Sequence, residues 1–422
     1  MEGVVFDSIS KYQIWGKEPL STGFSRTSAT DTISKWIGNK LIKVICGQRR
    51  CGKSFLIRQI MNMLVEKKIA KKESVLYINM EYGAFSFIKN NEDLFNLALE
   101  FRKNFSKNKK CFLFIDEIQK IDGWEKCVNS LAQDFTEDWE IFITGSNASL
   151  LSGELATLIS GRYISYTLFP FSYNEFCGIT ERGKNAESFS QYMQKGGMPE
   201  CFKLTDDETR RHYVSNLRDS IILRDIVDRY QVRDIRLLDQ LIELIADSIG
   251  SYFSVNKLAN VIASNGGKAN SVTIGNYIEY LKDVFFIHEV PRYDVSGKKI
   301  LTGDRKFYIN DPSFRYFSTI IRENTPGKYL ENAVLLHLLR EGYTVQAGSV
   351  SGKEIDFVAK KNNSVIYVQA AYILSDEKVI SREFGNLEMI KDNFPKIVVT
   401  LDPVSFGNIN GIEHFRAWEW IK

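Results

Sequence analysis

The chain has 422 residues, of which 44% are hydrophobic and 25% charged, and its formal net charge at pH 7 is +3. This length exceeds one ordinary hydrophobic core, so we expect roughly two to four domains. The small net charge excludes a strong attraction of polyanions by the protein as a whole. Any nucleic-acid binding therefore depends on local clusters of basic residues. The six cysteines contain no C-x-x-C pair and the four histidines are dispersed, which argues against a disulfide framework or a zinc site.

No run of about 18 apolar residues occurs, and residues 1–14 lack the apolar core of a signal peptide. We therefore expect a soluble, cytoplasmic protein that has reduced thiols and makes no membrane contact. The residues before about 40 form a lead-in, which is turn-like around residues 19–23 and helical from residue 32 to residue 36.

Residues 47–54, GQRRCGKS, fit the phosphate-binding loop G-x-x-x-x-G-K-[ST]. The loop follows a mostly apolar strand at residues 41–45 and precedes helical spacing of apolar residues at 55–64, as the motif requires. In this geometry Lys53 reaches the β- and γ-phosphates, Ser54 ligates Mg²⁺, and the backbone amides point at a phosphate. The residues predicted to bind ATP are Gly47, Arg50, Cys51, Gly52, Lys53, Ser54 and Phe55.

Residues 111–115, CFLFI, indicate a buried strand that ends in Asp116 and Glu117, which is the Walker B pattern. The carboxyl end of such a strand places Asp116 beside the Mg²⁺ shell. Glu117 then polarises the attacking water as a general base. Residues 74–80 and 139–144 predict two further strands of the same sheet.

The strand at 139–144 ends in Gly145-Ser146-Asn147, where a sensor of the γ-phosphate belongs. Asn147 or Ser146 is the candidate sensor, and the same position can instead cap a short helix at 148–151. Arg162 immediately precedes a strand predicted at 163–168. It can stabilise charge on a γ-phosphate in cis or toward a neighbouring subunit, and an ordinary surface arginine is the alternative.

These segments resemble one family of bacterial and archaeal ATPases that is similar to AAA+ and signal-transduction ATPases. The resemblance rests on G-x-R-R-x-G-K-S, I-D-E-I-Q-K, T-G-S-N, S-G-R-Y before F-P-F-S-Y-N-E-F, and G-G-M-P-E at 196–200. It covers nearly the whole chain after about residue 30. It implies an α/β P-loop NTPase with a parallel sheet of the ASCE or AAA+ kind, nucleotide-driven homo-oligomers, and a C-terminal region of poorly defined function.

Residues 210–233 are helical and charge-laced, which suits a lid or spacer. Apolar periodicity then predicts helices at 237–249, 256–263 and 271–284, with a turn at 265–267 and strands at 285–291 and 306–309. Three helices and a hairpin are typical of a winged helix-turn-helix, although a purely structural module is the alternative. The candidate contacts to DNA or RNA are Thr273, Asn276, Lys298, Lys299, Arg305 and Lys306.

The tail resembles PD-(D/E)XK endonucleases in its predicted order of helix, hairpin, strand, helix and strand between residues 329 and 401. In those enzymes a helix Glu, a hairpin Asp and a Glu-x-Lys hold Mg²⁺ and activate water. Glu331 and Asp356 match the first two positions, but Gln369 is neutral where an acid belongs and Ala371 lacks the cation. We therefore expect a degenerate nuclease fold that binds nucleic acid or protein, with an active nuclease as the alternative.

The expected organisation is a P-loop ATPase domain with its lead-in at 1–180, a helical lid or spacer at 181–235, a winged-helix domain at 236–322 and a nuclease-like α/β domain at 323–422. The predicted activity is Mg²⁺-dependent ATP hydrolysis coupled to binding of DNA or of a protein partner. Two alternatives stay open, namely a slow nucleotide switch that recruits a protein and an ATP-regulated, metal-dependent nuclease.

Overall fold

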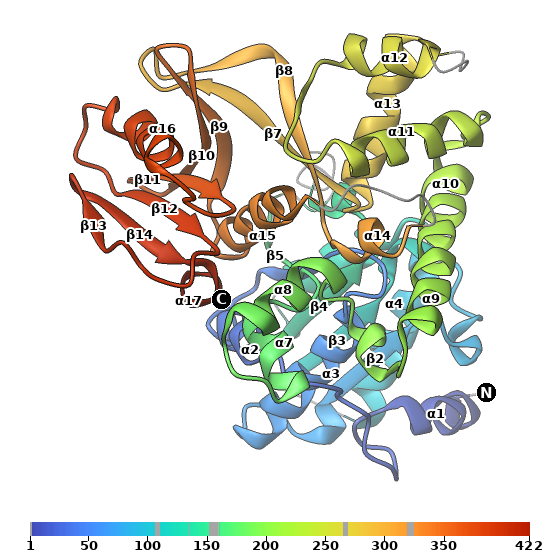
Figure 1. Ribbon diagram of the computed structural model, residues 1–422. Helices are drawn as coiled ribbons and strands as arrows, with labels where there is room; N and C mark the ends of the chain where they lie inside the picture. Colours follow the sequence, from blue (N-terminus) through green and yellow to red (C-terminus); the bar gives the residue numbers. More distant parts are fainter. Residues whose placement is uncertain are drawn as a thin grey trace. The chain divides into compact units, whose positions relative to one another are not determined.

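The computed structural model describes residues 2–105, 110–134, 136–151, 159, 161–264, 269–318 and 325–422. The turn predicted at 265–267 and the boundary predicted at 322/323 lie outside these residues. The chain divides into two compact units, Met1–Leu168 and Phe169–Lys422, and each has its own sheet (Figure 1). None of the helices in the described ranges is long and apolar enough to cross a membrane.

Unit 1 contains a five-stranded parallel sheet with the strand order β2-β3-β4-β1-β5. Strands β1 to β4 are buried along their whole length, as expected for a parallel sheet that is covered on both faces. This confirms the predicted parallel α/β sheet. The strands are β1 (Ile42–Cys46), β2 (Val75–Asn79), β3 (Cys111–Asp116), β4 (Trp139–Gly145) and β5 (Tyr163–Thr167).

The helices of unit 1 include one that the sequence places too late. The lead-in helix begins at Thr27 instead of residue 32, because Ala29 and Ile33 on its buried face pack into the core with Ile57 of the following helix. The helices are α1 (Glu2–Ile9), α2 (Thr27–Ser34), α3 (Lys53–Glu66), α4 (Asn91–Phe105) and α5 (Trp124–Gln133), with 3-10 turns at Ser10–Tyr12, Lys72–Ser74, Gly83–Phe85, Ile118–Lys120 and Ala148–Leu151.

Unit 2 contains a nine-stranded mixed sheet in the order β13-β14-β12-β11-β10-β9-β7-β8-β6. Strand β7 pairs with β9 in parallel, so the hairpin of the predicted winged helix and the strands of the predicted nuclease-like part share this sheet. The four-part division of the chain stays a prediction. The strands are β6 (Tyr252–Phe253), β7 (Ile287–Asp294), β8 (Lys299–Ile309), β9 (Thr344–Val350), β10 (Lys353–Lys361), β11 (Ser364–Ala371), β12 (Lys396–Thr400), β13 (Asn408–Ile409) and β14 (Ile412–Arg416).

The helices predicted at 237–249, 256–263 and 271–284 occur at Ile235–Asp247, Val255–Ser264 and Ser271–Asp283. The orders α11-β6-α12-α13-β7-β8 and α15-β9-β10-β11-α16-β12 are those expected of the two folds, whose identities stay predictions. The helices are α7 (Tyr173–Thr180), α8 (Ala186–Lys195), α9 (Asp207–Ser220), α10 (Asp228–Tyr230), α11 (Ile235–Asp247), α12 (Val255–Ser264), α13 (Ser271–Asp283), α14 (Ser313–Tyr316), α15 (Pro326–Arg340), α16 (Glu377–Glu388) and α17 (Ala417–Trp420), with a 3-10 helix at Pro199–Lys203 and a π-helix at Ile221–Val227.

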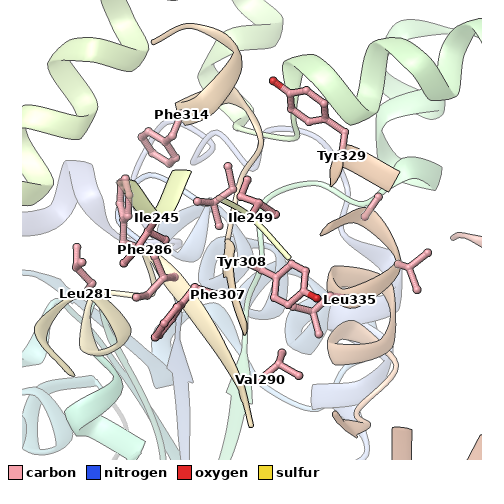
Figure 2. Packing of buried hydrophobic residues seen from close by; sticks show 14 of the residues in the cluster. Ile245, Ile249, Leu281, Phe286, Val290, Phe307, Tyr308, Phe314, Tyr329 and Leu335 are labelled. Carbon is pink, nitrogen blue, oxygen red and sulfur yellow. The ribbon is translucent and has the colours of Figure 1, made fainter. Parts of the chain in front are cut away.

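One buried apolar cluster joins these elements, and Figure 2 shows part of it. It brings together Ile245 of α11, Leu281 of α13, Phe307 of β8 and Leu335 of α15. Each fully buried side chain of this size contributes roughly 1.5–3 kcal/mol relative to exposure. The three-helix part, the hairpin and the tail are therefore held by a shared core.

Candidate functional site

The phosphate loop connects β1 to α3 at the carboxyl end of the parallel sheet. A Cβ on Gly47 would lie 2.2 Å from the carbonyl oxygen of Leu168, so no larger residue fits there. Gly52 has φ +106, in the left-handed region that favours glycine, and directly precedes the first residue of α3. The loop therefore presents a helix N-terminus and a glycine-lined cradle to an anion, which fits a nucleotide phosphate.

Lys53 lies inside this loop, and its side chain is only 4% exposed. Its Nζ donates to the carbonyl oxygens of Gly47 at 2.9 Å and Gln48 at 3.1 Å, and lies 3.7 Å from Oε1 of Glu117. Burial alone lowers the pKa of Lys53, but the neighbouring carboxylates of Glu117 and Asp116 outweigh it and raise the pKa above the usual value. The ammonium therefore stays charged in the loop.

Asp116 ends β3 and is fully buried. Burial, together with the adjacent Glu117 carboxylate, raises its pKa, while a hydrogen bond from Ser54 acts in the opposite direction. The Ser54 hydroxyl and the Asp116 carboxylate are thus in contact, and both are the hard oxygen ligands that Mg²⁺ prefers. These residues fit the predicted metal site.

Three further residues hold the Asp116 carboxylate, and sequence reasoning missed them. Tyr77 donates its hydroxyl hydrogen to Oδ2 at 3.1 Å, Asn79 donates to the same oxygen at 3.0 Å, and Thr144 donates to Oδ1. Asn79 and Thr144 lie at the carboxyl ends of β2 and β4, next to the end of β3. Polar residues at the ends of neighbouring parallel strands are the feature that could have identified them.

Glu117 has a left-handed backbone, with φ +57 and ψ +51. Such a conformation costs a non-glycine residue about 1–2 kcal/mol and is common at functional sites. Its Oε2 accepts a hydrogen bond from Gln119 at 2.5 Å and one from Ser146 at 3.3 Å. Of the two candidate sensors, Ser146 therefore contacts Glu117, and the neighbouring Asn147 is 2% exposed.

The other predicted loop residues have different surroundings. Arg50 is exposed at the tip of the loop with φ +66. Cys51 is fully buried, and its thiol donates to the carbonyl oxygen of Leu168 at 3.3 Å. Burial raises the pKa of Cys51, so this thiol stays neutral and links the loop to the end of β5. The ring of Phe55 lies 4.9 Å from the guanidinium of Arg58.

Arg162 lies at the opposite end of the sheet. Strand β5 runs parallel to β1, with Tyr163 opposite Ile42 and Thr167 opposite Cys46, and the phosphate loop follows Cys46. One strand length, roughly 15 Å, separates Arg162 from the loop. The expected role in cis is therefore corrected, because this exposed arginine is on the amino-terminal edge. A role toward a neighbouring subunit stays a prediction.

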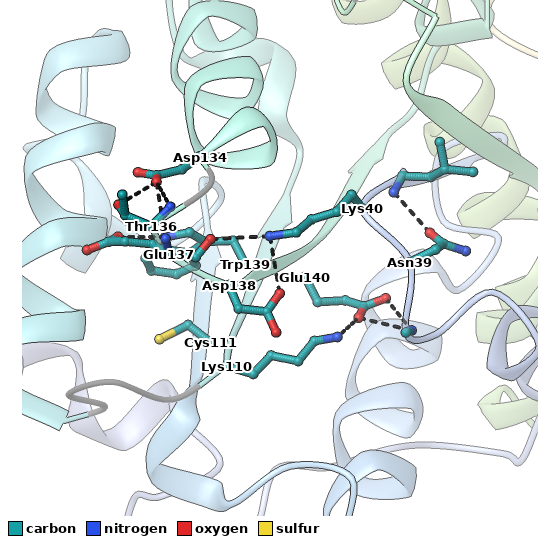
Figure 3. Close-up of polar contacts among 12 residues, drawn as sticks. Asn39, Lys40, Lys110, Cys111, Asp134, Thr136, Glu137, Asp138, Trp139 and Glu140 are labelled. Atoms are coloured by element: carbon teal, nitrogen blue, oxygen red, sulfur yellow. Dashed lines mark hydrogen bonds and ion pairs between the residues drawn. The ribbon is translucent and has the colours of Figure 1, made fainter.

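Ion pairs lie at the same amino-terminal edge of the sheet, and Figure 3 shows those of Lys40 with Asp138 and of Lys110 with Glu140. Glu140 on β4 is 1% exposed, pairs with Lys43 and with Lys110 at 2.5 Å, and accepts from the backbone N–H of Gly38 at 3.1 Å. An unpaired carboxylate at this depth would be strongly destabilising. The buried carboxylate at this edge therefore has partners within the protein, whereas the phosphate loop, Asp116 and Glu117 lie at the carboxyl edge of the sheet.

In unit 2 the structure brings together the three residues predicted for a nuclease-like site. The backbone N–H of Asp356 donates to the side-chain oxygen of Gln369 at 3.3 Å, and Glu331 is linked to Asp356 through Lys306. Lys306 itself is 2% exposed. This corrects its prediction as a surface contact for nucleic acid, because the strand position turns the side chain into the tail and away from solvent.

The other predicted nucleic-acid contacts lie on α13 and the β7–β8 hairpin. Asn276, Lys298 and Lys299 are exposed, whereas Thr273 is half-buried. Arg305 is also half-buried and pairs with Glu289 at 2.7 Å. The exposed positive charge of this group therefore comes from Lys298 and Lys299.

A Haemophilus influenzae protein, itself uncharacterised, is 36% identical to the chain over 405 residues, which are 94% of this chain and 98% of that protein. The chain belongs to the same family. An uncharacterised protein of Methanocaldococcus jannaschii is 29% identical to the chain over 413 residues, which are 92% of this chain and 89% of that protein. Among solved structures, a Walker-type ATPase of Pyrococcus abyssi matches 70% of the chain and 95% of its own length, with 14% identity and a TM-score of 0.47.

Two parts of the chain also match the models of domain families. Residues 39–177 match an AAA domain, and residues 186–324 match a domain of unknown function. The first match contains the phosphate loop, Asp116 and Glu117. Together with the five-stranded parallel sheet, it indicates that unit 1 has the P-loop fold of an AAA domain.

Proposed function

We propose that the chain is a Mg²⁺-dependent ATPase whose nucleotide state controls binding to DNA or to a protein partner. The observation that carries this proposal is the convergence of Lys53, Ser54, Asp116 and Glu117 at the carboxyl end of the parallel sheet. These residues supply a phosphate-binding cation, two oxygen ligands for a metal and a carboxylate base. That set matches the needs of phosphoanhydride hydrolysis.

Each residue has a defined part in the proposed reaction. The loop and Lys53 bind the phosphates, while Ser54 and Asp116 hold the metal, which neutralises charge on the phosphate oxygens when it is bound. Glu117 accepts the proton of the attacking water. The Lys53 ammonium donates to two backbone carbonyl oxygens and lies near Glu117. An incoming phosphate therefore competes with these oxygens for an ammonium group that is already positioned in the loop.

The first test is steady-state ATP hydrolysis by the full chain, with Lys53→Ala as the background. We expect hydrolysis that requires Mg²⁺ and is lost in the Lys53→Ala variant. Equal phosphate release by the two proteins would contradict the ATPase assignment, because Lys53 is the residue placed against the phosphates.

Coupling to DNA is tested by adding duplex or single-stranded DNA to the same assay. The exposed Lys298 and Lys299 support a DNA contact. Each lysine that contacts a phosphate makes the slope of log K against log[salt] more negative by about 0.9. The double variant Lys298→Ala/Lys299→Ala should reduce DNA affinity and its salt slope. The exposed pair Lys67 and Lys68 in unit 1, changed to alanine, is the matched control.

A slow nucleotide switch is the second candidate function, and the surroundings of Glu117 support it. Its carboxylate is held by Gln119 and Ser146 and lies beside Lys53, so it is engaged before any nucleotide arrives. A switch predicts tight ATP binding with hydrolysis that DNA does not accelerate, and recruitment of a protein in the ATP state. Exposed Arg162 further supports a homo-oligomer in which a neighbouring subunit supplies an arginine to the γ-phosphate.

A further inference from the structure

Lys306 of β8 lies at the centre of the carboxylates of the nuclease-like tail. Its Nζ is 2.7 Å from Oε1 of Glu331 on α15, 2.5 Å from Oε1 of Glu354 and 3.8 Å from Oδ1 of Asp356, both on β10. The Lys306 side chain is 3% exposed, compared with 15% for Glu331 and 11% for Asp356. An ammonium group therefore occupies the space in which these acidic side chains converge.

Neighbouring contacts fix β8 in this position. Tyr308 donates its hydroxyl hydrogen to Oε1 of Glu331 at 2.6 Å, and Asn332 makes a two-way hydrogen-bonded pair with the backbone of Ile309 at 3.0 Å in each direction. Gly250 closes the other side, where an added Cβ would lie 2.7 Å from Oε2 of Glu331. The strand that delivers Lys306 is thus tied to α15 over several residues.

The electrostatics agree with a filled cluster. Burial alone lowers the pKa of Lys306, but Glu331, Asp356 and Glu354 more than reverse this and place the pKa above the usual lysine value. Within the described part of the chain, no group of three or more His, Cys, Asp or Glu side chains is arranged to hold a metal ion.

We propose that the Lys306 ammonium takes the place of the metal ion in the nuclease-like centre, so that the cluster is an ion-pair lock between β8 and the tail. On this proposal the cluster binds no metal ion and does not support metal-dependent cleavage. The lock also fastens the hairpin that carries Lys298 and Lys299 to α15 and β10. This inference goes beyond the proposed ATPase function and does not depend on it.

The first experiment measures Mn²⁺ binding to the nucleotide-free full chain by electron paramagnetic resonance. Wild-type binding should be the same as that of the double variant Glu331→Gln/Asp356→Asn, because the ammonium already fills the cluster. The Lys306→Met variant should gain a Mn²⁺ site, and adding Glu331→Gln and Asp356→Asn to it should remove that site. Wild-type binding that drops in the double variant would overturn the proposal, and so would the absence of any gain in Lys306→Met.

The second experiment measures amide hydrogen exchange of β8 and α15, and it needs no metal. Opening of these segments should be roughly 10²–10⁴-fold more frequent in Lys306→Met, because the variant leaves buried carboxylates unpaired. The same change at the exposed Lys353 of β10 is the matched control and should have no such effect. If Lys306→Met fails to fold, Glu354→Gln removes one partner of the lock at a half-exposed side chain. Unchanged exchange in these segments in the folded variant would overturn the lock.

Discussion

Lys53 in unit 1 and Lys306 in unit 2 are both buried lysines that lie beside acidic residues, but their hydrogen-bond partners differ. Lys53 donates to two backbone carbonyl oxygens, and its nearest carboxylate is 3.7 Å away. Lys306 contacts two carboxylates directly at 2.7 and 2.5 Å. A ligand phosphate can replace neutral carbonyl oxygens around Lys53, whereas it would have to displace full negative charges around Lys306.

The surroundings of the two lysines extend this difference. Lys53 begins α3 behind Gly52, so a helix N-terminus and a glycine cradle add attraction for an anion. Lys306 lies in the middle of a sheet strand with Tyr308 on the same carboxylate. The comparison shows that a lysine with acidic neighbours marks a binding site only where its charge is not already satisfied.

The largest expected effect is on ATP hydrolysis at the proposed nucleotide site of unit 1. Glu117→Gln should reduce the single-turnover rate of ATP hydrolysis by about 10²–10⁴-fold, because it removes the general base, while ATP affinity changes little. Single-turnover hydrolysis and fluorescent-nucleotide binding measure the two quantities. Glu92→Gln, at an exposed carboxylate of α4, is the control. Undiminished hydrolysis would show that Glu117 is not the base.

The next effect compares the two lysines in the same terms. Lys306→Met should lower the free energy of unfolding of unit 2 by about 3–5 kcal/mol, since it leaves buried carboxylates without their cation. Lys53→Met should lower that of unit 1 by only about 1 kcal/mol, because it leaves mainly carbonyl oxygens unpaired. Denaturant-dependent hydrogen exchange reports each unit separately. Equal losses in the two variants would remove the distinction drawn between the sites.

A smaller effect tests whether Asn79 supports Asp116 in the proposed Mg²⁺ site. Asn79→Ala removes a hydrogen bond to the Asp116 carboxylate and should raise the Mg²⁺ concentration for half-maximal hydrolysis by about 10–100-fold. The exposed Asn96 of α4, changed to alanine, should leave that concentration unaltered. A normal Mg²⁺ requirement in Asn79→Ala would mean that the carboxylate needs no support from β2.

The last effect concerns the pH dependence of the stability of unit 2. Burial, with Arg340 nearby, lowers the pKa of His337 to about 3, so the folded chain holds this histidine neutral. The resulting stability is complete above the unfolded pKa of about 6.5 and falls by about 1.4 kcal/mol per pH unit as pH decreases toward 3. The free energy of unfolding, measured by urea titration at several pH values between 7 and 4, should therefore fall less steeply with decreasing pH in His337→Gln than in wild type. His212→Gln, at an exposed site, should keep the wild-type slope.

Local pattern was sufficient for much of this molecule. The phosphate loop, the Walker B pair, most strands and the helices predicted at 237–249, 256–263 and 271–284 lie within a few residues of their predicted positions, because glycine spacing and apolar periodicity act over short stretches of chain. Helices α1, α4 and α5 were not predicted. The lead-in helix α2 is an exception, since its burial depends on contacts with α3 that no local pattern contains.

The sequence by itself determined the residues of the proposed nucleotide site, because a consecutive loop and a strand end specify Lys53, Ser54, Asp116 and Glu117. Only the tertiary structure decided which other residues join a site. Strand pairing placed Arg162 at the far edge of its sheet, and the approach of β8 to α15 and β10 turned Lys306 into an internal cation. The reason is physical, because a charge acquires its role from the partners that surround it and those partners come from distant parts of the chain.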